Sequence, residues 1–362
     1  MFFLCFFFSG CLNYLDVSPD GKQIVYMQFR DGDAENENAL FIINSDGTKK
    51  KEVLSSKNLA HNLFPAFSSD GSRIAYIKLE SYGKKAQSDG ENGPELWVMK
   101  KDGSDNQKLA SLFKALSIDW RTEEGFYFIF LSYFRWSPDG KKIVYHYLEQ
   151  IGRQEWEGSI CLVDVKSKKI EHLTSEKDKS CTYPTFSSNG KKITYISGIT
   201  DLNRGFYGDL WITDVDGKNK KKIIIDSSES ENGSFMGPVV LSPDGKKIAF
   251  SYVQADEKNQ RIWVADADGG NARPVSENGS WVNPQWSPNG RMLIWEVAGG
   301  HMPNYKVGIV DLETNWTKIF EGISSPKWFP DSKRIAYSDT ENKNLCVSNI
   351  DGSENKVLVK SK

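Results

Sequence analysis

The stretch LSPDGKKIAF at residues 241–250 decides the fold, because its pattern of turn and strand residues recurs along the whole chain. Its turn element, Ser-Pro-Asp-Gly, has counterparts that start at residues 18, 68, 137, 187, 242, 287 and 329. The last counterpart is the most altered, since it reads Phe329-Pro330-Asp331-Ser332 and lacks the Ser and the Gly. Repeats of this length indicate a tandem architecture built from one supersecondary unit.

The composition of the turn explains why it recurs. Pro presets φ for the first corner of a tight turn, Asp or Asn tolerates the second corner, and Gly supplies a positive φ. An aliphatic residue and an aromatic residue follow at a spacing of two, as in Ile248 and Phe250. A spacing of two places both side chains on one face of a strand. Each turn therefore joins two antiparallel strands.

Two more strand-like segments follow in each copy, and a turn that usually contains Asp-Gly separates them. One unit is thus a four-stranded antiparallel sheet. Radial stacking buries both faces of such sheets and leaves only short edges. We therefore predict an all-β chain, a seven-bladed β-propeller of four-stranded antiparallel blades, with residues 12–362 as its single domain. Six blades are the alternative, because the seventh copy is worn.

The repeat resembles that of TolB-type propellers, which are relatives of the WD-repeat class. The resemblance is carried by Trp286-Ser287-Pro288-Asn289-Gly290 and by Leu210-Trp211-Ile212, and it extends from about residue 12 to 360. It implies the propeller fold and is weakly specific for function. TolB itself has an extra amino-terminal α/β domain, and the sequence before the first copy does not resemble one.

Composition limits the classes of partner and chemistry. The chain has 46 basic and 48 acidic residues, a formal net charge of −2, and therefore no sequence-wide field for nucleic acid. The nucleophile-elbow, zincin, P-loop and dinucleotide-binding motifs are missing from the sequence. The five Cys form no C-x-x-C pair, and only four His are present. We expect no catalytic residues, no metal site and no cofactor.

The amino terminus is unlike the repeats. Residues 2–8 are entirely apolar, and Ser9-Gly10-Cys11 follows, which is typical of the end of an export signal. The stretch also resembles a lipobox, which would make Cys11 the lipidated first residue. We therefore interpret residues 1–11 as a leader and expect a periplasmic or cell-surface protein that contacts the membrane only through such an anchor. The alternative is a cytoplasmic scaffold that begins with a spare hydrophobic strand.

Candidate binding residues lie on the connections of variable length. Both kinds of turn fall at one end of the ring, so the remaining connections share the opposite end, where rigid scaffolds usually carry binding loops. Trp, Tyr and Arg dominate binding hot spots. This reasoning selects Arg153, Trp156, Arg204, Tyr207, Trp281, His301 and Tyr305.

These residues lead to a functional hypothesis. We expect a monomeric, non-enzymatic scaffold of the cell envelope that engages a protein or glycan partner through this variable end. The competing interpretation is a propeller enzyme such as a polysaccharide lyase, in which scattered His and carboxylates would meet in space.

Overall fold

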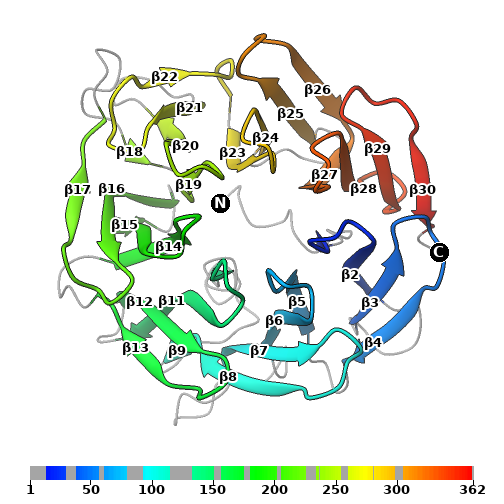
Figure 1. Cartoon of the computed structure of the whole chain (residues 1–362), viewed down its shortest axis with the longest axis horizontal. Coiled ribbons are helices and arrows are strands. Elements are labelled where there is room, and N and C mark those ends of the chain that lie inside the picture. Colours follow the sequence, from blue (N-terminus) through cyan, green and yellow to red (C-terminus); the bar gives the residue numbers. More distant parts are fainter. Residues whose placement is uncertain are drawn as a thin grey trace.

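The computed structural model shows a ring of radially arranged β-sheets around a central channel, and it confirms the predicted seven-bladed β-propeller (Figure 1). The described residues are 14–29, 38–56, 61–79, 93–114, 133–150, 156–174, 180–201, 205–225, 234–235, 237–253, 260–279, 281–297 and 305–360. All regular elements within these ranges are strands, and none of their segments is a helix long and apolar enough to cross a membrane.

Each blade runs outward from an innermost strand to an outermost strand. Blade 1 comprises β1 (Leu15–Val17), β2 (Gln23–Phe29), β3 (Asn38–Asn44) and β4 (Lys51–Ser55). Blade 2 comprises β5 (His61–Phe67), β6 (Arg73–Leu79), β7 (Pro94–Lys100) and β8 (Gln107–Ser111). Blade 3 comprises β10 (Phe134–Trp136), β11 (Lys142–Gln150), β12 (Trp156–Asp164) and β13 (Ile170–His172).

The other four blades follow the same order. Blade 4 comprises β14 (Ser180–Phe186), β15 (Lys192–Asp201), β16 (Gly205–Asp214) and β17 (Lys221–Ile223). Blade 5 comprises β18 (Ser234–Phe235) with β19 (Val240–Leu241), then β20 (Lys247–Val253), β21 (Gln260–Asp266) and β22 (Arg273–Pro274). Blade 6 comprises β23 (Trp281–Trp286), β24 (Met292–Val297), β25 (Lys306–Asp311) and β26 (Thr317–Glu321). Blade 7 comprises β27 (Ile323–Trp328), β28 (Arg334–Asp339), β29 (Leu345–Asn349) and β30 (Lys356–Val359).

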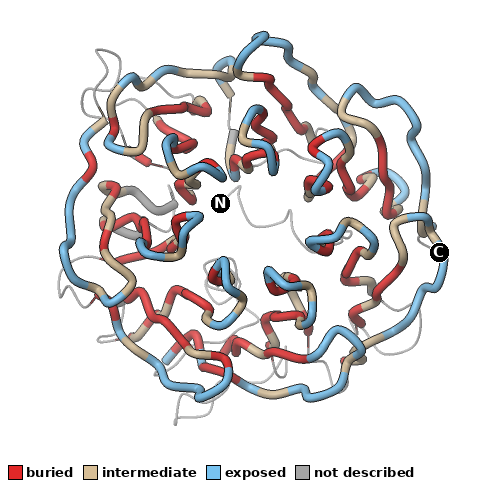
Figure 2. Tube along the Cα trace, in the orientation of Figure 1, coloured by how far each residue is buried: buried red, intermediate tan, exposed pale blue. Residues whose placement is uncertain are grey.

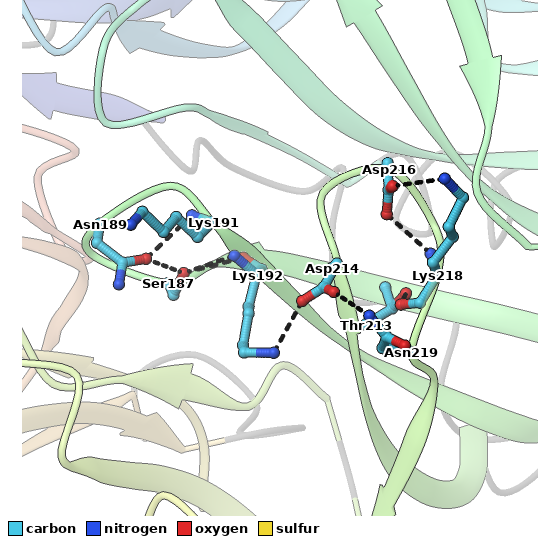
Figure 3. Close-up of polar contacts among 9 residues, drawn as sticks. All are labelled: Ser187, Asn189, Lys191, Lys192, Thr213, Asp214, Asp216, Lys218 and Asn219. Atoms are coloured by element: carbon cyan, nitrogen blue, oxygen red, sulfur yellow. Dashed lines mark hydrogen bonds and ion pairs between the residues drawn. The ribbon is translucent and has the colours of Figure 1, made fainter.

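The repeated turn is held by side-chain hydrogen bonds, which blade 4 illustrates (Figure 3). The Ser187 hydroxyl donates to Asn189 Oδ1 over 2.9 Å and accepts the backbone N–H of Lys192 over 2.9 Å. Asn189 Oδ1 also accepts the N–H of Lys191 over 3.0 Å. Small oxygen-bearing side chains suit this role because they can hydrogen-bond to nearby backbone groups.

The worn seventh copy forms the same turn with different side chains. Ser332 adopts a φ of 57° at the position of the usual Gly, and its N–H donates to the Phe329 carbonyl over 3.0 Å. Asp331 Oδ1 accepts the N–H groups of Lys333 and Arg334, which replaces the missing Ser. The seventh copy is therefore a complete blade, and the six-bladed alternative is wrong.

Both kinds of turn lie at one end of the ring, which we call the turn end. In every blade an N–H of the turn between the third and fourth strands donates to a carbonyl of the Ser-Pro-type turn, as Val215 does to Lys191 over 3.0 Å in blade 4. The remaining connections therefore lie at the opposite end, which we call the variable end. This arrangement confirms the predicted separation of repeated turns from variable connections.

The ring closes by packing of faces, and none of the described strands of blade 7 pairs with a strand of blade 1. A single core cluster joins blades 1 and 7 and includes Leu15, Phe329 and Leu345. At the turn end, the Cβ direction of Gly21 points to Pro330 of blade 7 at 3.1 Å, in the same way as that of Gly71 points to Pro19 at 3.3 Å. The seam between blades 7 and 1 thus repeats an ordinary contact between neighbouring blades.

Aromatic residues at the ends of the innermost strands tie neighbouring blades together. The indole N–H of Trp286 donates to the Val240 carbonyl of the preceding blade over 3.0 Å. Trp136 makes the equivalent bond to Ala66 over 3.2 Å. Figure 2 shows the resulting pattern, with burial concentrated between the blades and exposure at the turns and outer edges.

Two local features depart from the simple repeat. In blade 3, Phe113–Lys114 forms β9, which pairs in parallel with β11. Phe235 of β18 pairs with both Gly208 and Tyr252, so blades 4 and 5 share one continuous sheet. Cys161, Cys181 and Cys346 are buried free thiols.

Candidate functional site in the central channel

Four of the residues selected from the sequence have a described backbone, and it lies at the variable end. Trp156 begins β12, Tyr207 lies near the start of β16, Trp281 begins β23 and Tyr305 directly precedes β25. The side chains of the first three lie outside the described part of the structure, as do Arg153, Arg204, His301 and Cys11 in full. Tyr305 is therefore the selected residue whose surroundings can be followed.

Tyr305 lies at the variable end and interacts electrostatically with the carboxylate of Glu296. Its side chain is half-buried, and burial, followed by the charge of Glu296, raises its pKa. Glu296 lies near the end of β24, and its Oε2 accepts the N–H of Ser325 from blade 7 over 3.2 Å. Burial raises the pKa of Glu296, whereas the Ser325 N–H and the charge of Lys327 oppose that change. Burial and the charge of Glu296 also raise the pKa of Tyr14.

Three more charged residues come from innermost strands of different blades. Asp16, Arg135 and Lys327 each stand two residues before the turn, in β1, β10 and β27. Asp16 Oδ2 accepts the N–H of Phe67 over 2.8 Å, and burial raises its pKa against the opposing charge of Lys327. Burial lowers the pKa of Lys327.

Arg135 shows that these groups face one another across the channel. It belongs to blade 3, yet its charge acts on Asp16 of blade 1 and on Lys327 of blade 7. Blade 3 is adjacent to neither blade 1 nor blade 7 in the ring. The interaction therefore crosses the channel that the innermost strands surround (Figure 1). We call Tyr14, Asp16, Arg135, Glu296 and Lys327 the channel cluster.

Aromatic rings stand beside the channel cluster. The Tyr14 and Phe64 ring centroids are 4.2 Å apart, and the Arg135 guanidinium lies 4.0 Å from the centroid of Tyr133. Tyr133 in turn meets Tyr183 edge-on at 5.5 Å. These contacts have the geometry of aromatic pairs and cation–π interactions.

Two of these aromatic residues have an unusual backbone. Phe64 and Tyr183 adopt φ values of 54° and 53°, and each precedes a Pro within a bulge of its innermost strand. A bulky residue with positive φ is uncommon. The same positive φ before a Pro recurs at Asn283 and Ser325 in the bulges of blades 6 and 7, so the bulge belongs to the repeat. The bulge is therefore a built feature that fixes where these rings stand.

The channel cluster combines cations, carboxylates and aromatic faces, which suits binding of a polar ligand with charges of both signs. Within the described ranges, His, Cys, Asp and Glu form no group of three that could hold a metal ion. The two histidines His61 and His146 are each 2% exposed; His61 Nδ1 lies 3.5 Å from Asn38 Nδ2, and His146 Nδ1 lies 3.1 Å from the Thr182 hydroxyl. His61 is at the variable end, as expected, but it belongs to the packed interior.

Sequence reasoning selected loop aromatics and missed the channel cluster. The available signal was the position two residues before each turn, which changes from copy to copy while its neighbours repeat. It reads Asp16, Ala66, Arg135, Thr185, Val240, Gln285 and Lys327. Charged residues at a position that the repeat does not specify indicate a role beyond folding.

Comparison with solved structures places this geometry among known propellers. Neither a protein-family model nor a curated protein matches the sequence. TolB from Acinetobacter baumannii is similar at 20% identity with a TM-score of 0.56, over 86% of this chain and 67% of that chain. An oligogalacturonate lyase in complex with manganese is similar at 13% identity with a TM-score of 0.64, over 93% of this chain and 89% of the lyase.

A third similar structure bears on ring closure. The β-propeller domain of the Trilobed protease from Pyrococcus furiosus, described as having an open velcro topology, is 16% identical with a TM-score of 0.63. The match covers 97% of this chain and 96% of the protease domain. The structural matches, together with the seven repeated turns, show that this chain has the fold of a TolB-type seven-bladed β-propeller.

Proposed function

We propose that the protein is a non-enzymatic binding scaffold of the cell envelope, which engages a protein or glycan partner at the variable end of the ring. The observation that carries the proposal is the path from Tyr305 through Glu296 to the channel cluster. Half-buried charges and aromatic rings that the repeat does not require are typical of a binding site built on a rigid scaffold. Trp156 and Tyr207, at and near the starts of β12 and β16, would provide the outer part of the same surface.

A capture experiment tests this placement. The triple variant Trp156→Ala/Tyr207→Ala/Tyr305→Ala should lose a partner that the unchanged protein captures from an envelope extract, and a cross-link should map to the variable end. Trp316→Ala is the control, because Trp316 is 38% exposed and lies on a turn of blade 6 at the opposite end. Equal capture by all three proteins would refute the placement.

An Arg135→Ala variant tests whether the ligand contacts the channel cluster as well as the residues at the rim of the variable end. If the ligand reaches the channel cluster, this variant should weaken capture by about tenfold or more, the usual effect of removing a hot-spot arginine. Unchanged affinity in Arg135→Ala, with loss in the triple variant, would restrict the site to the loops.

A polysaccharide lyase is the second candidate, and its support is the similarity to the oligogalacturonate lyase in complex with manganese. The deciding measurements are the metal content of the purified protein and the release of unsaturated products from oligogalacturonate. A stoichiometric metal together with cleavage would replace the scaffold proposal.

The envelope location rests on residues 2–11, which lie outside the described part of the structure. Mass spectrometry of the mature amino terminus tests it directly. A terminus at Cys11 that carries acyl chains supports the anchored form, and an intact Met1 in the cytoplasmic fraction would support the cytoplasmic scaffold instead.

A further inference from the structure

The turn end of blades 3 and 4 carries an excess of lysines that the chain as a whole does not have. The turn segments 137–142, 164–169, 187–192 and 214–222 contain eleven lysines and four aspartates, a net charge of +7 in a chain whose net charge is −2. The corresponding segments of blades 5 to 7, residues 242–247, 266–273, 287–292, 311–318, 329–334 and 349–356, balance to zero. Those of blades 1 and 2, residues 18–23, 44–51, 68–73 and 100–107, carry a net charge of +2, so the positive charge is concentrated on blades 3 and 4.

We call these eleven lysines the lysine face. They are Lys141, Lys142, Lys166, Lys168, Lys169, Lys191, Lys192, Lys218, Lys220, Lys221 and Lys222, and all except the half-buried Lys142 are exposed. Blades 3 and 4 are neighbours in the ring (Figure 1), and Gly217 of the outer turn of blade 4 lies against the Leu173 carbonyl that follows β13. The face therefore includes the inner and outer turns of two blades in contact.

Most of these lysines have no ion-pair partner among the described residues. Four of the lysines pair with described carboxylates, in the pairs Lys169–Glu171, Lys192–Asp214, Lys218–Asp216 and Lys222–Asp209. Figure 3 shows two of these pairs on blade 4. The other seven make no ion pair with any residue in the described ranges. Seven unpaired ammonium groups on a rigid surface attract an extended anionic partner.

Two exposed isoleucines show what kind of anionic partner fits. Ile170 begins β13 and is 40% exposed, and Ile224 directly follows β17 and is 73% exposed. The Ile224 carbonyl lies against Gly269 of blade 5, and Ile170 is paired with Val163 of β12. Aliphatic side chains among lysines gain free energy by entering the boundary between lipid headgroups and acyl chains, and they gain little from a nucleic acid or a glycan.

The type of cation supports the same partner. The lysine face contains no Arg, the residue whose planar fork recognises phosphate or carboxylate in specific geometry. Lysines attract a negatively charged lipid surface without fixed geometry, at roughly a fivefold gain in affinity for each lysine near the surface. We propose that the lysine face is a peripheral binding surface for anionic phospholipid membranes, which leaves the variable end of the ring free for its partner.

Co-sedimentation with vesicles tests the proposal on the full chain. The unchanged protein should bind phosphatidylcholine vesicles that contain about 30% phosphatidylglycerol, should not bind pure phosphatidylcholine, and should dissociate as salt is raised. The variant Lys166→Glu/Lys220→Glu/Lys221→Glu should bind these vesicles at least roughly 100-fold more weakly, since three attractive charges are lost and reversed.

A matched control separates local from overall charge. Lys22→Glu/Lys246→Glu/Lys333→Glu changes the net charge by the same amount at exposed lysines on blades 1, 5 and 7. This variant should bind within a few-fold of the unchanged protein. Thermal unfolding of both triple variants checks that the ring remains intact, and equal losses of binding in the two variants would overturn the proposal.

The isoleucines distinguish a membrane from other polyanions. Ile224→Ser should weaken vesicle binding several-fold, and Ile319→Ser should not, although Ile319 of blade 6 is also exposed at 44%. Heparin and poly-uridylate serve as soluble polyanions. Binding to either through the lysine face, without binding to phosphatidylglycerol vesicles, would overturn the membrane proposal in favour of a polymer.

Discussion

His61 makes the stability of the ring depend on pH in a way that can be calculated. It is the first residue of β5, its side chain is 2% exposed, and its Nδ1 lies 3.5 Å from Asn38 Nδ2. Burial lowers the pKa of His61 from 6.5 to about 4. The unfolded chain therefore takes up a proton at a higher pH than the folded chain does.

The direction and the size of the change in stability with pH follow from this difference in proton affinity. The stability contributed by neutral His61 is complete above pH 6.5 and is lost as the pH falls toward 4, because protons favour the unfolded state in that window. The difference predicts a loss of about 2 kcal/mol at about pH 5 and a limit of about 3 kcal/mol at lower pH.

Urea unfolding followed by tryptophan fluorescence measures this effect. We expect the free energy of unfolding to fall between about pH 7.5 and pH 5 by about 2 kcal/mol more in the unchanged protein than in His61→Gln, in which the titrating group is absent. His172→Gln is the control, because His172 is exposed. The same pH dependence in the unchanged protein and in His61→Gln would refute the reasoning.

Two further predictions concern contacts between blades. Gly103→Ala should destabilise the protein by about 2 kcal/mol more than Gly47→Ala, because overpacking adds to a similar backbone strain. Both glycines have a φ near 90°, but an added Cβ would lie 2.3 Å from the Val53 carbonyl oxygen at Gly103 and 3.5 Å from its nearest neighbour at Gly47; equal shifts in the urea midpoint would contradict this. Trp286→Phe should cost about 1–2 kcal/mol, since it leaves the Val240 carbonyl without its indole donor. Trp316→Phe, at an exposed site, should stay within about 0.5 kcal/mol in the same assay.

The fold could be predicted from the sequence because the repeated turn has strict chemical requirements. A position that must hydrogen-bond backbone N–H groups accepts few residue types, so the requirement remains visible in seven copies. Even the altered seventh copy meets this requirement, because Asp331 also accepts the backbone N–H that the Ser hydroxyl accepts in other copies. The count of seven blades followed from this chemistry, although strict pattern matching would have found only six.

The channel cluster could not be predicted in the same way. Asp16, Arg135 and Lys327 are far apart in the sequence, and only closure of the ring brings their charges within reach of one another. The sequence search looked for side chains on long connections, whereas these residues stand on the innermost strands. The short strand β18, which joins blades 4 and 5 into one sheet, was missed for a similar reason, since two residues carry no periodic signal.

The hydrogen bonds of the repeated turn do not require charged side chains at the turn end. Asn189 makes the same two turn hydrogen bonds as Asp139 does in blade 3, with no charge. The lysine that follows each of these turns contributes its backbone, as the Lys191 carbonyl does to Val215, while its ammonium group points into solvent. The turn would form with neutral residues at these positions, as Ser72 shows in blade 2. A cation directly follows this turn in six of the seven copies, so Lys141 and Lys191 belong to the repeat. The additional lysines of segments 164–169 and 214–222 have no such explanation, and the proposed membrane contact would account for them.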